Sequence, residues 1–532
     1  MSARSAPADE ELSHRQILVV FSGLMLGVLL ASVDQTIVAT ALPTIVGELG
    51  GLDRIAWVVT AYILAVTVTT PVYGKLGDLF GRKRLFQVAI VIFLVGSVLA
   101  GLSQGMTQLI VCRGIQGAGA GGLIVLTQAI IADIVSPRRR GRYQGYFGAV
   151  FGASSVIGPL LGGFFTDHLS WRWIFYVNLP LGALALAVTA VVLPASRRRP
   201  NVRLDVVGSL LLMAAITCIV FITSWGGNEH EWTSPRIIGL GVAAIGLLAA
   251  FIAVERRVTE PVMQLALFRG RTFDVATSVS FILGIGMFGV ISFIPLFLQI
   301  VTGVSATDSG LLLVPLMLGL LTASIFSGRM ISWTGHYRIF PIVGTATTAL
   351  GIFALSTMGP DTSFPTAGVY MVVVGIGLGL TMQVLVLATQ NSVRSADLGM
   401  ATASVNFFRS VGASVGVALF GAIFNARLAT ALTSVFADGV PEQVTGGSVT
   451  PQLVARLPDA VRADFVAAFS HALTDTFLFA VPIMVVGFAL TWLLRDVPLR
   501  STIHADDRAR ELAMASAQGT AEPETFGDPT AG

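Results

Sequence analysis

The sequence predicts an all-α polytopic membrane protein, in which two six-helix bundles flank two inserted linker helices. Three observations carry this prediction. First, 54% of the 532 residues are hydrophobic and only 12% are charged, against about 25% charged residues in a typical soluble domain. Second, apolar segments long enough to cross a bilayer, which takes about 20 residues, recur along the chain. Third, motifs of the first half return in the same order in the second half.

Fourteen transmembrane helices are predicted from the apolar segments, most of them joined by short connections, so that successive helices are antiparallel neighbours. The segments cover approximately residues 17–41, 55–73, 85–103, 107–133, 143–165, 172–194, 205–225, 236–254, 273–299, 306–327, 339–358, 366–389, 401–424 and 471–494.

The internal repeat is clearest after the second and tenth segments. Gly74, Gly81 and Arg84 of the earlier connection have counterparts at the same spacing in Gly328, Gly335 and Arg338. Ser332 stands in the second connection where Asp78 stands in the first. Parallel halves of this kind are typical of transporters that bind their substrate near the midplane between the halves.

Basic residues indicate the orientation. Loops at one end carry clusters at 75–84, 138–142, 197–203 and 256–271, whereas few Lys or Arg lie at the other end. Cytoplasmic loops are enriched in Lys and Arg, so the first end, together with both termini, is predicted to be cytoplasmic.

The predicted segments divide the chain into five regions. A cytoplasmic tail covers 1–15, the first bundle 16–195, the linker with two helices 196–271, and the second bundle 272–495 with an outer loop at 426–470. The remaining residues, 496–532, have the composition of a mostly disordered cytoplasmic tail.

Asp34 is the only acidic residue well inside a predicted span. A charge at the centre of a membrane helix costs about 2.5–3.5 kcal/mol on insertion scales, and such residues usually mark functional sites. The alternative is an aspartate that is hydrated near the surface or that only holds helices together.

Arg113 lies at a similar depth on the fourth predicted helix, roughly 10 Å below the outer surface at about 1.5 Å per residue. We therefore expect Asp34 to pair with Arg113, or to share Gln116 with it. A carboxyl that is neutral in one conformation and ionised in another would couple transport to protons, whereas a static ion pair would not. Gln35 and Gln116 are candidates for substrate binding.

The connection Gly74–Arg84 is predicted to be a tight cytoplasmic hairpin. Asp78 can face basic side chains or a helix N-terminus, and Asp133 can accept a hydrogen bond from Arg82 or Arg84. Such a cluster would hold the cytoplasmic side closed. The predicted gating residues are Gly74, Asp78, Gly81, Arg82, Arg84 and Asp133.

The fifth predicted helix carries a run of small residues around a proline. Glycines in membrane helices allow close packing, and a proline frees a backbone carbonyl and bends the axis. We expect close helix packing here, and a bend that takes part in a moving gate is the alternative. The residues are Gly152, Gly158, Pro159, Gly162 and Gly163.

Several of these stretches resemble the fourteen-helix drug:proton antiporters of the major facilitator superfamily. They are Asp34–Pro43, Gly74–Arg84, Arg113–Gly121, Gly152–Gly163 and Trp171–Pro180. The resemblance implies alternating access and multidrug efflux driven by inward proton movement. It also implies coupling roles for Asp34 and Arg113, a loop gate at Asp78 and Arg82, and an antiport signature in the fifth helix.

The sequence therefore predicts a proton-coupled antiporter of a bacterial plasma membrane that exports amphipathic, hydrophobic or cationic small molecules and confers antibiotic resistance. No cofactor, no metal and no nucleic-acid partner are expected, and the protein is expected to function as a monomer driven by the proton gradient. Two alternatives stay open. One is export of an endogenous lipid, siderophore or self-made antibiotic, and the other is a membrane-embedded lipid-modifying enzyme, which the scattered histidines disfavour.

Overall fold

The structure is a computed structural model that describes residues 14–50, 54–193, 205–227, 229–258, 260–304, 311–435, 454 and 458–499. These residues form helices, and the only β-type pairing among them is an isolated bridge between Gly226 and His230. Most of the two predicted tails and most of 436–457 in the predicted outer loop lie outside the described residues.

Each predicted apolar segment overlaps a helix of the structure. Thirteen of the described spans are long and apolar enough to cross a membrane, with α6 and α7 forming one of them, and the 17-residue α13 is shorter. The first group of helices is α1 His14–Leu49, α2 Ile55–Phe80, α3 Arg82–Gly101, α4 Met106–Ile134, α5 Pro137–His168, α6 Trp173–Tyr176 and α7 Asn178–Val192. The inserted pair is α8 Val206–Trp225 and α9 Pro235–Glu255. The last group is α10 Arg271–Val301, α12 Val314–Thr334, α13 Ile339–Leu355, α14 Phe364–Ser392, α15 Leu398–Val435 and α18 Asp459–Thr491, with short 3₁₀ turns η2 at Leu265–Arg269 and η3 at Ser395–Asp397.

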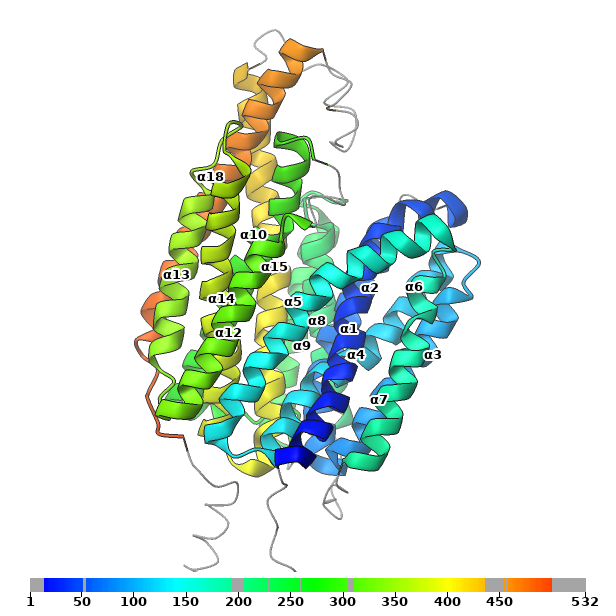
Figure 1. Ribbon diagram of the computed structural model, residues 1–532, viewed down its shortest axis with the longest axis vertical. Coiled ribbons are helices and arrows are strands. Elements are labelled where there is room, and N and C mark those ends of the chain that lie inside the picture. The colour runs from blue at the N-terminus through cyan, green and yellow to red at the C-terminus, as the bar shows by residue number, and fades with distance from the viewer. Residues whose placement is uncertain are drawn as a thin grey trace, which may run out of the picture.

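The helices pack in two groups with the same internal arrangement (Figure 1). In the first, α4 packs against α2 and α3, and α1 packs against α5 and α7. In the second, α14 packs against α12 and α13, and α10 packs against α15 and α18. The inserted helices α8 and α9 pack on each other, and α8 also contacts α2 and α15. The repeat in the sequence is therefore a repeat in packing.

The two bundles contact each other mainly through α5 with α12 and α2 with α15. Small residues bring these backbones together: a Cβ on Gly145 would lie 2.7 Å from the Ser324 carbonyl, and one on Gly74 would lie 2.8 Å from that of Gly399. Both contacts lie toward the end predicted to be cytoplasmic, here called the inner end. At the other end, the outer end, the two bundles diverge (Figure 1).

The connection at Gly74–Arg84 differs from the predicted hairpin loop. The α2 helix continues to Phe80 and α3 begins at Arg82, so that only Gly81 turns the chain. Gly81 has a φ of 94°, and its counterpart Gly335, which ends α12, has a φ of 79°. Glycine adopts this left-handed backbone without the Cβ clash that other residues meet. Gly74 instead serves the close approach of α2 to α15.

The predicted outer loop at 426–470 is also shorter than expected. The α15 helix continues to Val435 and α18 begins at Asp459, so both helices extend further outward than the apolar segments (Figure 1). Phe424 of α15 packs edge-on against Phe469 of α18, with 5.1 Å between ring centroids. Leu428 and Leu432 of the α15 extension are buried in the same apolar cluster as Phe465 and Phe469 of the α18 extension, which explains why both stay helical beyond the lengths that a bilayer requires.

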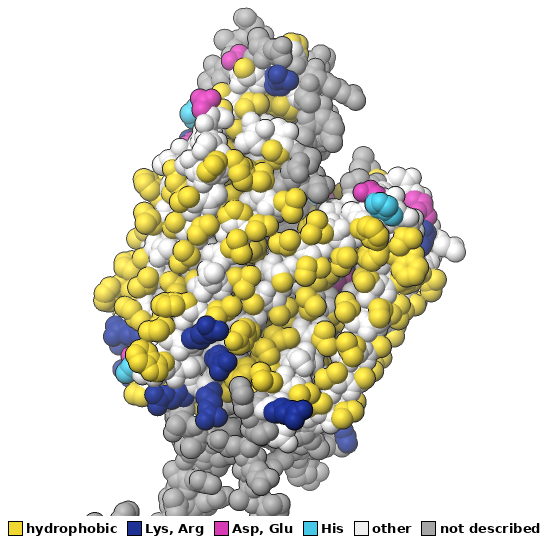
Figure 2. Space-filling model, in the orientation of Figure 1, with side chains coloured by type: hydrophobic (Ala, Val, Ile, Leu, Met, Phe, Trp, Pro, Cys, Tyr) yellow, Lys and Arg dark blue, Asp and Glu magenta, His cyan; other side chains and the backbone are white. Residues whose placement is uncertain are grey.

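The surface is that of a multi-pass membrane protein. Figure 2 shows apolar side chains over most of one face, with Lys and Arg gathered near its lower end. Large apolar side chains such as Val242 and Ile245 of α9 are exposed. Contiguous exposed apolar surface of this extent is rare in soluble monomers and fits contact with lipid.

Candidate functional site

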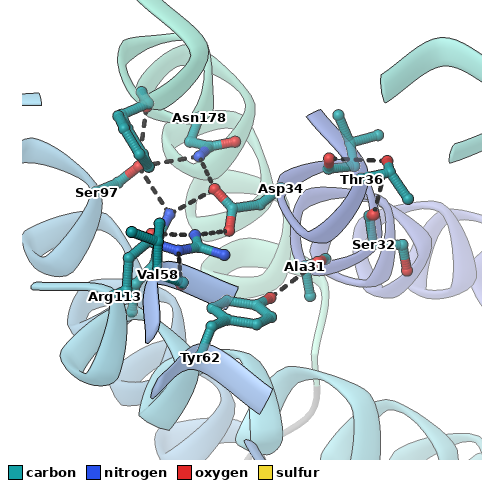
Figure 3. Close-up of polar contacts among 12 residues, drawn as sticks. Ala31, Ser32, Asp34, Thr36, Val58, Tyr62, Ser97, Arg113 and Asn178 are labelled. Carbon is teal, nitrogen blue, oxygen red and sulfur yellow. Dashed lines mark hydrogen bonds and ion pairs between the residues drawn. The ribbon is translucent and has the colours of Figure 1, made fainter. Parts of the chain in front are cut away.

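Asp34 lies in α1, completely buried, and is surrounded by hydrogen-bond donors from two other helices (Figure 3). Its Oδ2 accepts from Arg113 Nη1 of α4 at 2.5 Å. Its Oδ1 accepts from Gln116 Nε2 at 2.6 Å and from Asn178 Nδ2, at the start of α7, at 2.9 Å. Both carboxylate oxygens are thus engaged in the way that suits the ionised form.

Arg113 is itself held in place by the first bundle. Its Nη1 also donates to Gln116 Oε1 at 2.7 Å, and its Nε donates to the Val58 carbonyl at 3.3 Å. The guanidinium lies 4.2 Å from the centroid of the Tyr62 ring, an arrangement that stabilises a cation. The Tyr62 hydroxyl in turn donates to the Ala31 carbonyl of α1 at 2.9 Å.

Ser97 of α3 completes the network. Its Oγ accepts from Gln116 Nε2 at 3.1 Å and from Asn178 Nδ2 at 2.9 Å, and it donates to the Phe175 carbonyl at 2.9 Å. Close helix packing makes this possible, since a Cβ on Gly96 would lie 2.7 Å from the Cα of Gln116. The polar cluster therefore joins five membrane-crossing segments of the first bundle without reaching the second.

The arrangement can act chemically as a protonation switch. A buried pair that loses one partner is destabilised by about 3–5 kcal/mol, because the other charge stays buried without compensation. Protonation of Asp34 would remove the charge that holds Arg113 and Gln116. Loss of this charge would weaken the contact with Arg113 most, because a neutral carboxyl can still accept hydrogen bonds from Gln116 and Asn178.

The structure brings Asp34, Arg113 and Gln116 together, and the expected pairing is confirmed. Gln35 is half-buried and forms no hydrogen bond to this cluster. The sequence interpretation missed Asn178, Ser97 and Tyr62. Asn178 could have been noticed as a polar residue in an otherwise apolar segment, but it has no charge to single it out.

A second polar cluster lies at the inner end. Asp78 Oδ1 accepts from Arg82 Nη2 at 2.6 Å, and Arg82 Nη1 also pairs with Asp133. The Asp78 oxygens accept as well from the backbone amides of Gly399 at 3.1 Å and Met400 at 3.0 Å, at the start of α15 in the second bundle. Asp78 thus meets a basic side chain and a helix N-terminus at once, both of which the sequence suggested.

Arg84, the other candidate partner of Asp133, is exposed, and Arg82 occupies that role. In the second half, Ser332 replaces the acid: its Oγ accepts from the Arg142 amide at 3.1 Å and donates to the Gly328 carbonyl at 2.9 Å. The repeated motif therefore makes contacts between bundles in both halves. The first half has an ion cluster with two acids, and the second has hydrogen bonds from Arg138 and the Arg142 amide to Ser332 and Trp333.

The glycines of α5 divide between two neighbours. A Cβ on Gly152 would lie 3.0 Å from Leu321 of α12 in the second bundle. Cβ atoms on Gly158 and Gly162 would collide with α1, the former 2.8 Å from Thr36 Cβ and the latter 2.6 Å from the Ile37 carbonyl. Gly163 has open space around it, so close packing does not explain it. Pro159 lies inside the continuous α5 helix, next to the contact with α1.

Comparison with known proteins places this geometry in context. The family model of the Major Facilitator Superfamily matches residues 24–417. An uncharacterized MFS-type transporter of Mycobacterium tuberculosis is 45% identical over 492 residues, which cover 92% of this chain and 71% of the relative. The multidrug transporter protein MdtP of Bacillus subtilis is 34% identical, with 95% of this chain and 98% of the relative covered.

Multidrug resistance protein 3 of Bacillus subtilis is 36% identical, with 89% of this chain and 94% of that protein covered. Among solved structures, the proton:xylose symporter XylE superposes with a TM-score of 0.62 at 13% identity, covering 93% of this chain and 99% of XylE. The human organic anion transporter MFSD10 superposes with a TM-score of 0.60 at 14% identity, covering 88% of this chain and 99% of that chain. At these identities the solved structures show a shared fold.

Proposed function

We propose that this chain, which belongs to the major facilitator superfamily, exports amphipathic small molecules from the cell in exchange for protons. Membership of this family makes it a multi-pass membrane transporter and not an enzyme. The proton gradient would be the energy source, and the protein would act in the plasma membrane with fourteen helices and both termini in the cytoplasm.

The observation that carries proton coupling is the complete burial of Asp34 among three donors. The cluster lies inside the first bundle, next to the crossing of α1 and α5 at Thr36 and Gly158. A movement of α1 against α5 would therefore change the donors that reach Asp34. Binding a proton would favour the conformation in which Arg113 has moved away, and a ligand shifts an equilibrium only through such a difference in affinity.

The contacts between bundles support alternating access. Contacts between Asp78 and α15, Gly145 and Ser324, and Ser332 and Arg142 lie in the inner half of the molecule. Breaking them while closing the outer end would expose the midplane to the cytoplasm. The Asp78–Arg82–Asp133 cluster would act as the gate that stabilises the closed inner end.

The relatives support export of chemically varied molecules, because two of them carry multidrug names. A second candidate is export of an endogenous product such as a lipid, a siderophore or a self-made antibiotic. One observation favours it: a 32% identical relative from Aspergillus aculeatus is named as the MFS-type transporter of a biosynthesis cluster. Extrusion of dyes and of lipids extracted from the native membrane, compared in the same vesicles, separates the two.

Proteoliposomes loaded with a pH-sensitive dye test the proposal. Addition of a transported compound should drive proton movement in the wild type, and Asp34→Asn should abolish that movement. Asp475→Asn is the matched control, because Asp475 is about half exposed near the outer end and lies 3.7 Å from Arg427. Coupled flux that survives in Asp34→Asn would refute the assignment of Asp34 as the coupling carboxyl.

A further inference from the structure

Arg409 is a half-buried arginine within a membrane helix, and it lies between the two bundles. It follows the start of α15 at Leu398 by eleven residues, which places it roughly 16 Å from the inner end of the helix. The backbone is fixed there by α10, since a Cβ on Gly284 would lie 2.9 Å from the Ala413 amide and would collide with the Arg409 carbonyl.

The side chain of Arg409 joins a cluster of neutral amides. Its Nη2 donates to Asn406 Oδ1 at 2.5 Å, one helical turn earlier. Asn406 Nδ2 donates in turn to Gln128 Oε1 of α4 at 2.6 Å, and Gln128 Nε2 lies 3.5 Å from Gln383 Oε1 of α14. The cluster therefore includes residues of both bundles, in the inner half of the membrane span and on the inner side of the midplane where transporters of this architecture bind substrate.

The half-buried Arg409 differs from the buried arginines of the described residues in what compensates its charge. Arg113 pairs with Asp34, and Arg82 pairs with Asp78 and Asp133. Arg140 donates to the backbone carbonyls of Ala132 and Val135. Arg409 has no ion pair within the described part of the chain, and its Nη1 is buried without any hydrogen-bond partner there.

An arginine cannot lose its proton in a protein, and removing even one of its donors from water without a partner is unfavourable. The structure thus holds one positive charge, with a free donor, at the meeting point of the two bundles. We propose that Arg409 binds the anionic group of the exported molecule, so that the preferred substrates are amphipathic anions carrying a carboxylate, sulfonate or phosphate. This inference rests on the proposed export function and specifies its substrate class.

The same charges disfavour the cationic substrates expected from the sequence. A cation at this level would meet Arg409 without an opposing carboxylate from the part of the chain that the structure describes, because both oxygens of Asp34 are engaged inside the first bundle. An anion gains a charge-assisted hydrogen bond from the free Nη1 and from any other guanidinium donor it reaches. Such bonds are about twice as strong as neutral ones, which is enough to discriminate between charged and neutral forms of one molecule.

The test compares one amphiphile in two charge states. Binding of 11-(dansylamino)undecanoic acid and of its uncharged methyl ester is measured by dansyl fluorescence, with the purified full-length protein in phosphatidylcholine nanodiscs. We expect the acid to bind the wild type at least tenfold more tightly than the ester. Arg409→Gln should weaken the acid about tenfold to a hundredfold and leave the ester unchanged, while Arg409→Lys should retain most of the preference.

Arg427→Gln is the matched control, because Arg427 lies on the same helix near its outer end and is about half exposed. Equal binding of acid and ester to the wild type, or no binding of the acid, would overturn the inference. So would a loss of acid and ester affinity together in Arg409→Gln, because that result would indicate a packing role.

Anionic phospholipids carry the same charge, so the titration is repeated with phosphatidylglycerol in the nanodiscs. Competition by phosphatidylglycerol that disappears in Arg409→Gln would assign the site to a lipid headgroup and overturn its assignment to the substrate.

Proton flux separates this inference from the proposed function. If the wild type binds the acid selectively but the acid drives no proton flux, only the proton-coupled exchange is refuted. If proton flux depends on Asp34 but Arg409→Gln binds the acid as tightly as the wild type, only the role of Arg409 is refuted.

Discussion

Asn178 connects Asp34 to Ser97 and stands at the point where α6 gives way to α7. Its Nδ2 reaches both partners at 2.9 Å, and its side chain is completely buried. We expect Asn178→Leu to reduce substrate-driven proton flux about tenfold or more, since a hydrogen bond to a charged group contributes about 1.5–3 kcal/mol. Equilibrium exchange of labelled substrate, which needs no net proton movement, should fall much less. Equal losses in both assays would contradict a role for Asn178 in positioning Asp34.

Glu48, beyond the outer end of the first span, offers a test with pH. Hydrogen bonds from Arg172 Nη1 and Trp171 Nε1, at 2.6 Å each, lower the pKa of Glu48 below its ordinary value. The contact therefore stabilises the fold above the ordinary carboxyl pKa and loses its effect as pH falls through the lowered pKa. The side chain is 49% exposed, so the contribution is at most about 1 kcal/mol.

We accordingly expect Glu48→Gln to lower the thermal unfolding temperature by about a degree at pH 7 and by less at pH 3. Differential scanning fluorimetry of both proteins at the two pH values provides the measurement. A difference of the same size at pH 3 would show that the effect does not arise from the ionised carboxylate.

For individual residues, the sequence predicted which charged side chains form the site, but it did not predict the neutral ones. Asp34 and Arg113 stand out because a charge in an apolar span is costly, and their depths could be compared by counting residues. Asn178 and Ser97 carry no such cost, and the break between α6 and α7 that aims Asn178 at Asp34 has no clear signal in the apolar pattern. Arg409 is recognisable in the sequence as a charge, but its lack of a counter-ion among the described residues depends on which helices surround it.

At the scale of elements, the crossing of α1 and α5 provides a matched pair of substitutions. Gly158→Ala would force a Cβ against Thr36 and within 3.1 Å of the Ile37 amide, whereas Gly163→Ala would enter open space. Overpacking costs about 1–3 kcal/mol, and the contact lies within three residues of Asp34. We expect Gly158→Ala to lower thermal stability and reduce exchange at least tenfold, while Gly163→Ala leaves both near wild type. Similar behaviour of the two variants would refute the packing explanation.

The inserted helix pair carries a carboxylate at each of its adjoining ends. Glu255 Oε1 accepts from the amides of Val262 at 3.0 Å and Met263 at 3.3 Å, and Asp205 Oδ1 caps α8 through the Gly208 amide at 2.8 Å. The second oxygen of each is buried without a hydrogen-bond partner among the described residues. A Cβ on Gly208 would contact both side chains, so the two acids lie close together.

Glu255→Gln should therefore raise the thermal unfolding temperature, because it removes one of two neighbouring charges and offers an amide donor to Asp205. Glu255→Ala should lower it, since two buried backbone amides lose their acceptor at about 1–3 kcal/mol each. Thermal unfolding of both variants in the same detergent tests this. Destabilisation of equal size in both would show that the carboxylate is needed in its ionised form.

For the whole molecule, the sequence predicted the helices and their repeat but not their ends or the way the bundles meet. A span is recognisable because about 20 apolar residues must face lipid, and that signal stops where α15 and α18 leave the bilayer. The prediction that Gly74 and Gly81 belong to one hairpin loop was wrong, because glycine is favoured both in closely packed helices and in turns. Gly74 lies in a packed helix, and only Gly81 forms the turn. Closure of the inner end was not predictable, since nothing in the sequence around Asp78 shows that the amides of Gly399 and Met400 in the second bundle would approach it.

The closed inner end leads to a prediction about the population of these arrangements. Gly328 of α12 faces Gly141 of α5 so closely that a Cβ on Gly328 would lie 2.9 Å from the Gly141 carbonyl carbon and would collide with its oxygen. Gly328→Val is incompatible with this contact. We expect it to separate the bundles at the inner end and to shift the equilibrium toward the conformation open on that side. Gly421→Val on α15, where nothing lies within 4 Å, is the control.

Ser324 reports on this opening, because it is 1% exposed and touches Gly145 and Gly148 across the interface. With Cys112 and Cys218 replaced by serine, Ser324→Cys should react slowly with a membrane-impermeant maleimide in inside-out vesicles. Gly328→Val should accelerate that labelling several-fold, and Gly421→Val should not. Unchanged labelling in Gly328→Val, with the protein still folded, would mean that the contact between Gly141 and Gly328 does not keep the inner end closed.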